Sequence, residues 1–422
     1  MNVTPKGNRL HIGLFGRMNV GKSSLLNLIV GQNIAITSSE AGTTTDVVEK
    51  AMELLPLGPV VFLDTAGLDD LSSLARLRLE KTHKVFDRAD VVLLVVEPEI
   101  WTDYEKNVLQ EAERRDLPLI VIVNKIDIRA PGEAFLAQLA EQVGRVVCVA
   151  STDRSNRDVY LAPLKRYLLE VCPDDFMASP PLIGDLLPPG GMAVLVVPID
   201  LEAPKGRLIL PQVQTIRDVL DNDSATLVVK DRELASTLDV LKRPPDIVVC
   251  DSQVVHTMCA ATPVGIPATT FSILFARHKG NLNEAARGAA AIASLKPHDR
   301  VLIAEACSHH PLEDDIGRVK IPRWLRQYTG LNLGVDIVAG RDYPDNLAEY
   351  ALIIHCGACM LTRREMLNRI QTAREAGVPI TNYGVAISFL QGLIRRVLSP
   401  FPAALTAFEE HFTQGMEEKS YE

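Results

Sequence analysis

The chain has 422 residues, of which 47% are hydrophobic and 23% charged, a composition that suits two or three folded domains of ~150 residues each. It excludes a wholly disordered chain and a small disulfide-stapled scaffold. The net charge of −9 argues against a protein that binds DNA or RNA without regard to sequence. No apolar run approaches the ~18 residues of a membrane helix, and no signal peptide is evident. The sparse set of seven cysteines fits a reducing cytoplasm. Together with the charge and the short apolar runs, it leads us to expect a cytoplasmic protein with no DNA or membrane partner.

Residues 1–172 have the pattern of a doubly wound α/β domain. Short, continuous apolar runs alternate with helical patterns, as expected for parallel strands that are buried on both faces. The predicted strands are Leu10–Phe15, Val60–Asp64, Val91–Val96, Leu119–Asn124 and Val146–Ala150. The predicted helices are Lys22–Val30, Ala75–Phe86, Tyr104–Arg115 and Ala134–Val143.

Two further α/β domains are expected after a proline- and glycine-rich linker at residues 173–191. Residues 192–264 contain only three predicted strands, and a sheet this thin needs a partner surface. Residues 265–422 form the last domain, with a polar tail after Pro402 that is expected to fray. The predicted strands are Ala193–Ile199, Thr226–Val229, Ile247–Cys250, Val301–Glu305, Val335–Val338 and Leu352–His355. The predicted helices are Gln212–Leu220, Leu234–Leu241, Leu282–Ala293, Arg363–Ala376 and Val385–Leu398.

The segment at residues 16–23 fits the phosphate-binding pattern G-x-x-x-x-G-K-S/T. It follows a predicted strand and opens a predicted helix, which is the context that the pattern requires. Its backbone N–H groups would surround phosphate oxygens, Lys22 would reach the β- and γ-phosphates, and Ser23 would bind Mg²⁺. The residues expected to contact the nucleotide here are Gly16, Asn19, Val20, Gly21, Lys22, Ser23 and Ser24.

An N-K-I-D motif at residues 124–127 ends a later predicted strand. The Asp127 carboxylate can accept two hydrogen bonds from guanine N1–H and N2–H₂, which adenine does not offer, so the motif favours GTP over ATP. Asn124 would brace the loop, and the Lys125 stem would cover the base. The residues expected around the guanine are Asn124, Lys125, Asp127, Ala150 and Ser151.

Two intervening segments are expected to respond to the γ-phosphate. In D-T-A-G, residues 64–67, Asp64 suits a water on Mg²⁺ and Gly67 can offer its N–H to the γ-phosphate. In G-T-T-T-D, residues 42–46, Thr44 is expected to reach Mg²⁺. The residues expected to act in hydrolysis are Lys22, Thr44, Asp64 and Gly67.

The order of these motifs over residues 10–170 resembles the P-loop GTPases of the translation-factor-like branch. The G-T-T-x-D segment and the asparagine in the P-loop are similar to those of tRNA-modifying and ribosome-assembly GTPases. The resemblance implies that Asn19 helps to bind K⁺, which stands in for an arginine finger. Leu68 occupies the place where Ras-like enzymes have a catalytic glutamine, so the resemblance implies slow, cation-assisted turnover used as a switch.

Three cysteines gather with histidines after two predicted strands of the last domain. Cys307 and His309 follow one strand, and the run His355-Cys356-Gly357-Ala358-Cys359 follows the other. Loops at the carboxyl ends of parallel strands converge, and C-x-x-C lets two thiolates bind one ion or cluster. The residue types therefore predict a soft-metal site, for which an iron–sulfur cluster and a Cys₃His zinc site are both natural.

C-x-H, a long gap and H-C-x-x-C downstream of a GTPase domain resemble the [FeFe]-hydrogenase maturation GTPases, and the segment 379–384 is similar to that family's C-terminal region. The resemblance implies that Cys307, Cys356 and Cys359 hold a [4Fe–4S] cluster. It also implies a homodimer, formed by the middle domain, that receives a diiron precursor carrying CO and CN⁻. Two radical-SAM maturases would build this precursor, and apo-[FeFe]-hydrogenase would accept it.

Three thiolates leave one iron of a cubane without a cysteine ligand, and His309, His355 and Glu305 are the candidates for that position. The main alternative is a K⁺-dependent GTPase of tRNA modification or ribosome assembly with a structural metal domain. The absence of a basic, aromatic-rich surface counts against it. A third hypothesis is a regulator that combines a nucleotide switch with an iron–sulfur sensor. The lack of a recognisable DNA-reading helix in the sequence counts against it.

Overall fold

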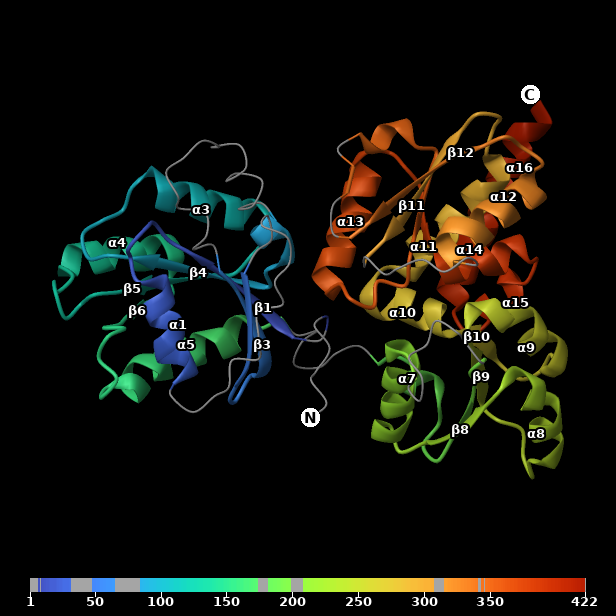
Figure 1. Ribbon diagram of the computed structural model, residues 1–422, viewed down its shortest axis with the longest axis horizontal. Coiled ribbons are helices and arrows are strands. Elements are labelled where there is room, and N and C mark those ends of the chain that lie inside the picture. The colour runs from blue at the N-terminus through green and yellow to red at the C-terminus, as the bar shows by residue number, and fades with distance from the viewer. Residues whose placement is uncertain are drawn as a thin grey trace. The chain divides into compact units, whose positions relative to one another are not determined.

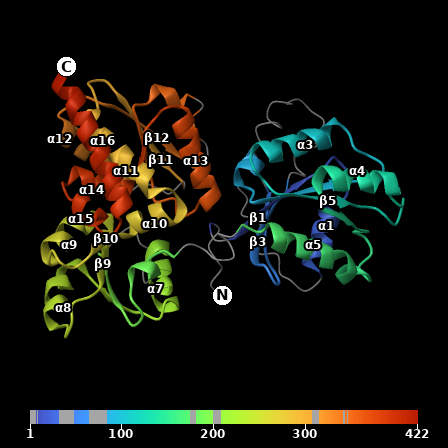
Figure 2. The same ribbon diagram turned by 180° about the vertical axis from the view of Figure 1, so that it is seen from behind.

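The computed structural model describes residues 7, 9–31, 48–64, 84–173, 181–198, 208–306, 315–340, 343–344 and 346–421. The chain forms two compact units, Met1–Ser179 and Pro180–Glu422, each seen as a ribbon in Figures 1 and 2. None of the helices in these ranges combines the length and the apolar character that crossing a membrane requires.

The first unit is built on one sheet. Its strands are β1 (Leu10–Phe15), β2 (Val48–Leu54), β3 (Gly58–Asp64), β4 (Val91–Val96), β5 (Leu119–Val123) and β6 (Val146–Cys148). They lie in the order β2-β3-β1-β4-β5-β6. Neighbouring strands are parallel except for β2, which pairs antiparallel with β3. Every residue of β1 and β4 is buried, as their continuous apolar sequences predict.

Helices cover both faces of this sheet (Figure 1). They are α1 (Lys22–Val30), α3 (Asp103–Arg114), α4 (Glu133–Val143) and α5 (Arg157–Val171). Leu25 of α1 and Leu161 of α5 belong to the core on one face, whereas Val108 of α3 and Leu139 of α4 belong to the core on the other. The predicted doubly wound α/β fold is therefore confirmed. The strand β2 and the helix α5 were not predicted, and most of the predicted helix Ala75–Phe86 lies outside the described residues.

The second unit contains two four-stranded parallel sheets, β10-β9-β7-β8 and β12-β11-β13-β14. The strands of the first sheet are β7 (Met192–Val196), β8 (Ala225–Val229), β9 (Ile247–Cys250) and β10 (Ala268–Thr270). Those of the second are β11 (Arg300–Glu305), β12 (Gly334–Ala339), β13 (Leu352–His355) and β14 (Ile380–Asn382). The first sheet thus has one strand more than predicted, since β10 lies beyond the boundary expected at residue 264.

One continuous core joins the two sheets. Val194 of β7, Ile303 of β11 and Phe275 belong to the same cluster of buried side chains. Phe275 lies on α10, which leaves the first sheet directly after β10. The helices of this unit are α7 (Leu210–Asp221), α8 (Leu234–Val240), α9 (Val255–Ala261), α10 (Phe271–Lys279), α11 (Leu282–Ala290), α12 (Ile321–Thr329), α13 (Arg363–Glu375), α14 (Tyr383–Leu390), α15 (Ile394–Leu398) and α16 (Pro402–Tyr421).

The prediction that the tail after Pro402 frays is wrong. This segment is the helix α16, which packs against α11. Ala404, Ala407 and Phe408 are buried on it, and the Phe408 ring lies 5.9 Å from that of Phe389, centroid to centroid. The apolar residues at helical spacing anchor a segment whose average composition is polar.

Candidate functional site: a nucleotide-binding loop and a thiol-bearing loop

The phosphate-binding loop lies between β1 and α1, where the motif predicts it. Gly21 has φ 97° and Asn19 has φ 62°, conformations that turn successive N–H groups toward one point. A Cβ atom on Gly21 would lie 2.2 Å from Nδ2 of Asn124, so only glycine fits there. Asn19 and Ser23 are exposed at the loop surface, and Ser24 is half-buried.

The Lys22 ammonium is buried against the loop. Its Nζ donates hydrogen bonds to the carbonyl oxygens of Gly16 and Arg17, at 2.5 and 3.0 Å, and the residue is 5% exposed. These two bonds hold the ammonium inside the loop, where a bound phosphate would lie close to it.

Asn124 ties two of the predicted motifs together. Its Nδ2 donates to the Val20 carbonyl at 2.8 Å, and its Oδ1 accepts from the Ser151 N–H at 3.1 Å. Asn124 is fully buried, so both bonds form away from water. The sequence predicted that Asn124 braces the loop, and the structure shows that its partners are the phosphate-binding loop and the segment Ala150–Ser151.

Lys125 and Asp127 of the N-K-I-D motif are less buried than Asn124, whereas Ile126 packs against the core on one face of the sheet. Lys125 has φ 62°, and its Nζ donates to Glu97 Oε1 at 2.5 Å. The Asp127 carboxylate is exposed, and its Oδ2 accepts a bond from the Thr152 hydroxyl at 3.3 Å. This carboxylate has free lone pairs for the two donors of a guanine edge.

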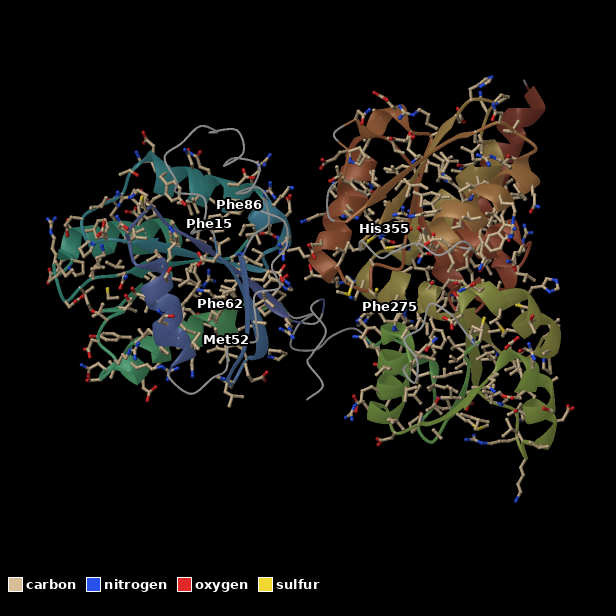
Figure 3. The ribbon with its side chains drawn as sticks, in the orientation of Figure 1. Phe15, Met52, Phe62, Phe86, Phe275 and His355 are labelled. Carbon is tan, nitrogen blue, oxygen red and sulfur yellow. The ribbon has the colours of Figure 1, made fainter. Side chains whose placement is uncertain are left out.

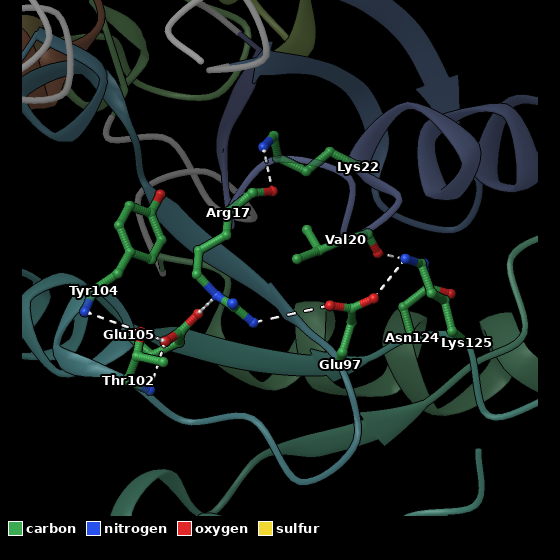
Figure 4. A network of polar contacts seen from close by, with 9 residues as sticks. All are labelled: Arg17, Val20, Lys22, Glu97, Thr102, Tyr104, Glu105, Asn124 and Lys125. Atoms are coloured by element: carbon green, nitrogen blue, oxygen red, sulfur yellow. Dashed lines mark hydrogen bonds and ion pairs between the residues drawn. The ribbon is translucent and has the colours of Figure 1, made fainter. Parts of the chain in front are cut away.

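Figure 4 shows a carboxylate network beside the phosphate-binding loop that the sequence did not indicate. Arg17 Nε donates to Glu105 Oε1 at 2.7 Å, and Arg17 Nη2 lies 3.9 Å from Glu97 Oε2. Glu105 is fully buried, and its other oxygen accepts from the Thr102 N–H at 2.7 Å. The loop is therefore held by α3, and Glu97 lies between Arg17 and Lys125. Arg17 lies inside the motif, but no local pattern identifies its partner Glu105, which lies 88 positions away.

Asp64, a residue that is 6% exposed, ends β3, and its carboxylate lies 4.0 Å from Lys50 Nζ. Its position next to the phosphate-binding loop follows from the pairing of β3 with β1. The other residues predicted to sense the γ-phosphate, Thr44 and Gly67, lie outside the described residues, as does Leu68.

The second candidate site lies at the carboxyl edge of the sheet formed by β11 and β13. These strands pair in parallel with Ala304 opposite His355, so the segments that follow them begin side by side. The Ala306 N–H donates to Cys356 Sγ at 3.1 Å, the kind of contact that stabilises a thiolate. Cys307 and His309, which come next in sequence, lie outside the described residues.

The loop from Cys356 to Leu361 turns sharply. Ala358 has φ 52°, and the Leu361 N–H donates to its carbonyl at 3.1 Å. Cys359 is half-buried; burial raises the pKa of its thiol, and Lys279 opposes the rise. Burial lowers the pKa of Lys279 itself to about 8. Among the described residues, no group of three or more potential ligands gathers within reach of one metal ion.

His355, expected as a possible cluster ligand, has both ring nitrogens engaged. Its Nδ1 lies 2.8 Å from the Cys356 carbonyl oxygen and its Nε2 lies 2.7 Å from Arg369 Nη1. Since Arg369 donates, Nδ1 carries the proton and donates to the carbonyl. Burial, and then the Arg369 charge, lower the pKa of His355 to about 3. In this arrangement the imidazole orients Cys356, and it would have to exchange a partner to bind metal.

Glu305, the third candidate for the fourth ligand, is also engaged. It is 2% exposed, its Oε2 accepts from Arg318 Nη2 at 3.1 Å, and its Oε1 accepts from the Tyr383 hydroxyl at 3.4 Å. Burial raises the pKa of Tyr383, with smaller contributions from Cys356 and Glu305. The Glu305 carboxylate thus forms a polar cluster with Arg318 and Tyr383 near the thiol-bearing loop.

Comparison with known families assigns both halves of the chain. Residues 11–125 match the family model described as a 50S ribosome-binding GTPase. Residues 182–280 match the hydrogen maturase F dimerization domain, and residues 283–400 match the hydrogen maturase F tetramerization domain. The chain belongs to the hydrogen maturase F family. The resemblance to hydrogenase maturation GTPases is therefore confirmed, and the tetramerization domain adds a mode of self-association that the sequence did not indicate.

MnmE and Der proteins are among the curated relatives, and they match only the GTPase part. The chain is 39% identical over 140 residues to a tRNA modification GTPase MnmE of Laribacter hongkongensis, covering 33% of this chain and 30% of the relative. It is 35% identical over 127 residues to GTPase Der of Wolinella succinogenes, covering 29% and 27%. The chain thus spans less than a third of these relatives' lengths. A solved structure of Era with MgGDPNP and nucleotides 1506–1542 of 16S ribosomal RNA is 26% identical, with a TM-score of 0.31, covering 37% of this chain and 56% of that chain.

By their descriptions, the two hydrogen maturase F domains are domains of self-association, and the first unit contains a GTPase domain. The GTPase domain supports binding of GTP or GDP with Mg²⁺.

Proposed function

We propose that the protein is a GTP-hydrolysing carrier in [FeFe]-hydrogenase maturation. It holds a [4Fe–4S] cluster on Cys307, Cys356 and Cys359, and it accepts a diiron precursor with CO and CN⁻ ligands from two radical-SAM maturases. It then delivers this cargo to apo-[FeFe]-hydrogenase. The observation that carries the proposal is the pair of adjoining hydrogen maturase F domains, the second of which contains the Cys-x-x-Cys loop. The proposed location is the cytoplasm, where thiols stay reduced.

The thiol-bearing loop fits an anionic iron–sulfur group. Thiols are the ligands that such clusters take, the Ala306 N–H already donates to Cys356 Sγ, and the buried Lys279 ammonium lies against the loop. When bound, the cluster would offer an iron without a cysteine ligand for contact with the cargo. His309 would occupy that position in the absence of cargo, or else His355 or Glu305 after exchanging a present hydrogen-bond partner. In the structure, His355 and Arg369 hold the Cys356 end of the loop.

The GTPase residues have proposed roles that follow from their motifs. Lys22 would neutralise the β- and γ-phosphates, and Ser23 with Thr44 would hold Mg²⁺. Asp64 would bind a water of that ion, and Gly67 would contact the γ-phosphate. Asn19, which is exposed on the loop, would bind K⁺.

The test is metal and sulfide analysis of the anaerobically purified protein, with EPR of the reduced state. Wild type should carry iron and sulfide, and serine at Cys307, Cys356 or Cys359 should remove or cripple the cluster, because a hydroxyl is a poor ligand for iron in a cubane. Cys259→Ser is the matched control, since Cys259 is a half-buried thiol of the same unit outside the proposed set. Colourless wild type that carries zinc would instead favour the tRNA- or ribosome-directed alternative.

Delivery requires its own assay. Protein loaded with a synthetic diiron complex should activate apo-hydrogenase, and the His309→Ala variant should keep the cluster while loading or releasing the cargo differently. Loaded wild type that leaves apo-hydrogenase inactive would contradict the carrier role.

A further inference from the structure

Lys279 ends α10 and places a buried ammonium against the thiol-bearing loop. Its Nζ donates to the carbonyl oxygens of Leu361 at 2.9 Å and Cys359 at 3.1 Å. The residue is only 2% exposed. Because these bonds join residues 82 and 80 positions apart, they fix the far end of the loop from another part of the fold.

Among the described residues this ammonium makes no ion pair with a carboxylate, and its hydrogen bonds go to the two carbonyls. Burying a cation without an opposite charge is costly. The carbonyl dipoles and the C-terminal end of α10 offset part of that cost. The anionic groups that favour the charged ammonium are first a thiolate at Cys359 and then the Glu365 carboxylate. The site is therefore electrostatically suited to an anion held by the cysteines of the loop.

We propose that Lys279 is a positioning residue for the cluster, which fixes the Cys359 end of the loop and offsets the negative charge of the thiolate-bound iron–sulfur group. The inference rests on the proposed function, because it takes the three cysteines as cluster ligands. Lys279 lies in the range that matches the dimerization domain, whereas the loop lies in the range of the tetramerization domain. One domain thus supplies the cation for thiolates of the next.

Three substitutions in the full-length protein separate charge from hydrogen bonding. Lys279→Gln keeps N–H donors without the charge, Lys279→Met keeps the bulk without donors, and Lys279→Arg keeps the charge. Reduction adds an electron to the cluster, so a nearby cation favours the reduced state. Lys279→Gln should therefore shift the reduction potential to more negative values, and Lys279→Arg should restore it toward wild type.

Cluster retention gives a second readout. Loss of an outer-shell partner typically weakens metal binding roughly 10- to 100-fold, so iron loss to a chelator should accelerate at least about tenfold in Lys279→Met. In iron-free protein, hydrogen exchange of the amides at residues 357–361 should also accelerate in this variant, independently of the cluster. The matched control is Lys242→Gln, an exposed lysine of the same unit, which should change none of these values.

The outcomes separate this inference from the proposed function. Wild type with iron and sulfide, together with an unchanged potential and iron-loss rate in Lys279→Gln, overturns the role of the charge. Unchanged loop exchange in Lys279→Met overturns the role of the hydrogen bonds. Wild type without iron and sulfide overturns the proposed function and the charge role with it. If Lys279→Met does not fold, as circular dichroism would show, the glutamine and arginine variants carry the test.

Discussion

Replacing Asn124 by alanine should damage the GTPase unit at two points at once. The Asn124 amide is fully buried, and it satisfies the Val20 carbonyl of the phosphate-binding loop and the Ser151 N–H of the base-facing segment. Val20 and Ser151 are themselves 1% and 7% exposed. Alanine would leave both backbone groups without this partner and close to an apolar void.

The expected loss of stability follows from that geometry. A buried backbone group left without its hydrogen bond costs about 1–3 kcal/mol, so the two groups together cost about 2–6 kcal/mol. A folded domain typically has about 5–15 kcal/mol in total, so the loss is a large part of the unit's stability. Because Lys125 and Asp127 belong to the same loop, we also expect GTP affinity to fall at least about tenfold, which corresponds to about 1.4 kcal/mol.

The measurement needs a probe of the first unit alone. The chain has two tryptophans, and in a Trp324→Phe background Trp101 reports on the first unit during urea unfolding. Asn382→Ala is the matched control, because Asn382 is 5% exposed and makes two comparable bonds, to Ser272 and Val385, in the second unit. The control should leave the Trp101 transition in place. A loss below about 0.5 kcal/mol for Asn124→Ala, the size of an ordinary surface change, together with unchanged GTP affinity, would refute the reasoning.

Three more outcomes are expected. Lys22→Met should abolish phosphate release from GTP while iron content stays at the wild-type level, since the ammonium acts on phosphates and the cysteines lie in the other unit; a parallel loss of iron would contradict independent units. Glu105→Gln should weaken GTP binding several-fold in a titration with a fluorescent nucleotide, because Arg17 loses its buried charged acceptor; unchanged affinity would mean that the network does not shape the loop. Replacing Na⁺ by K⁺ at constant ionic strength should speed hydrolysis if Asn19 binds K⁺, and a rate that ignores the cation would rule that role out.

The strands that are buried on both faces could be predicted from sequence almost to the residue. β1, β4, β9 and β13 have the predicted bounds, because burial on both faces leaves a local run of apolar side chains. The strand β2 has the sequence VEKAMEL, in which charged and apolar residues mix. Its pairing with β3 at the sheet edge, rather than its own composition, makes it a strand, and that information is not local.

The candidate sites also combine residues that a local sequence pattern predicts with residues that only the tertiary fold brings together. Motif spacing predicts the residues that would face a nucleotide, because a phosphate-binding loop is a contiguous piece of chain. The partners that hold these residues come from distant elements: Glu105 reaches Arg17 across 88 positions, and Lys279 reaches Cys359 across 80. A glutamate on a helix and a lysine at a helix end are ordinary surface residues by sequence. Only the tertiary fold shows that both are buried.

The helix α10 connects self-association with the thiol-bearing loop in physical terms. Thr270 is the last residue of β10 and accepts a hydrogen bond from Ile273, so the helix starts directly on the sheet of the dimerization domain. Phe271 and Phe275 bury it in the core that both sheets of the unit share. Its last residue, Lys279, holds the loop of Cys359. Close-packed interiors transmit displacements rather than absorbing them, so a change in packing at this sheet has a direct route to the cysteines. The hydrogen maturase F dimerization domain is in this respect part of the proposed metal site as well as an assembly surface.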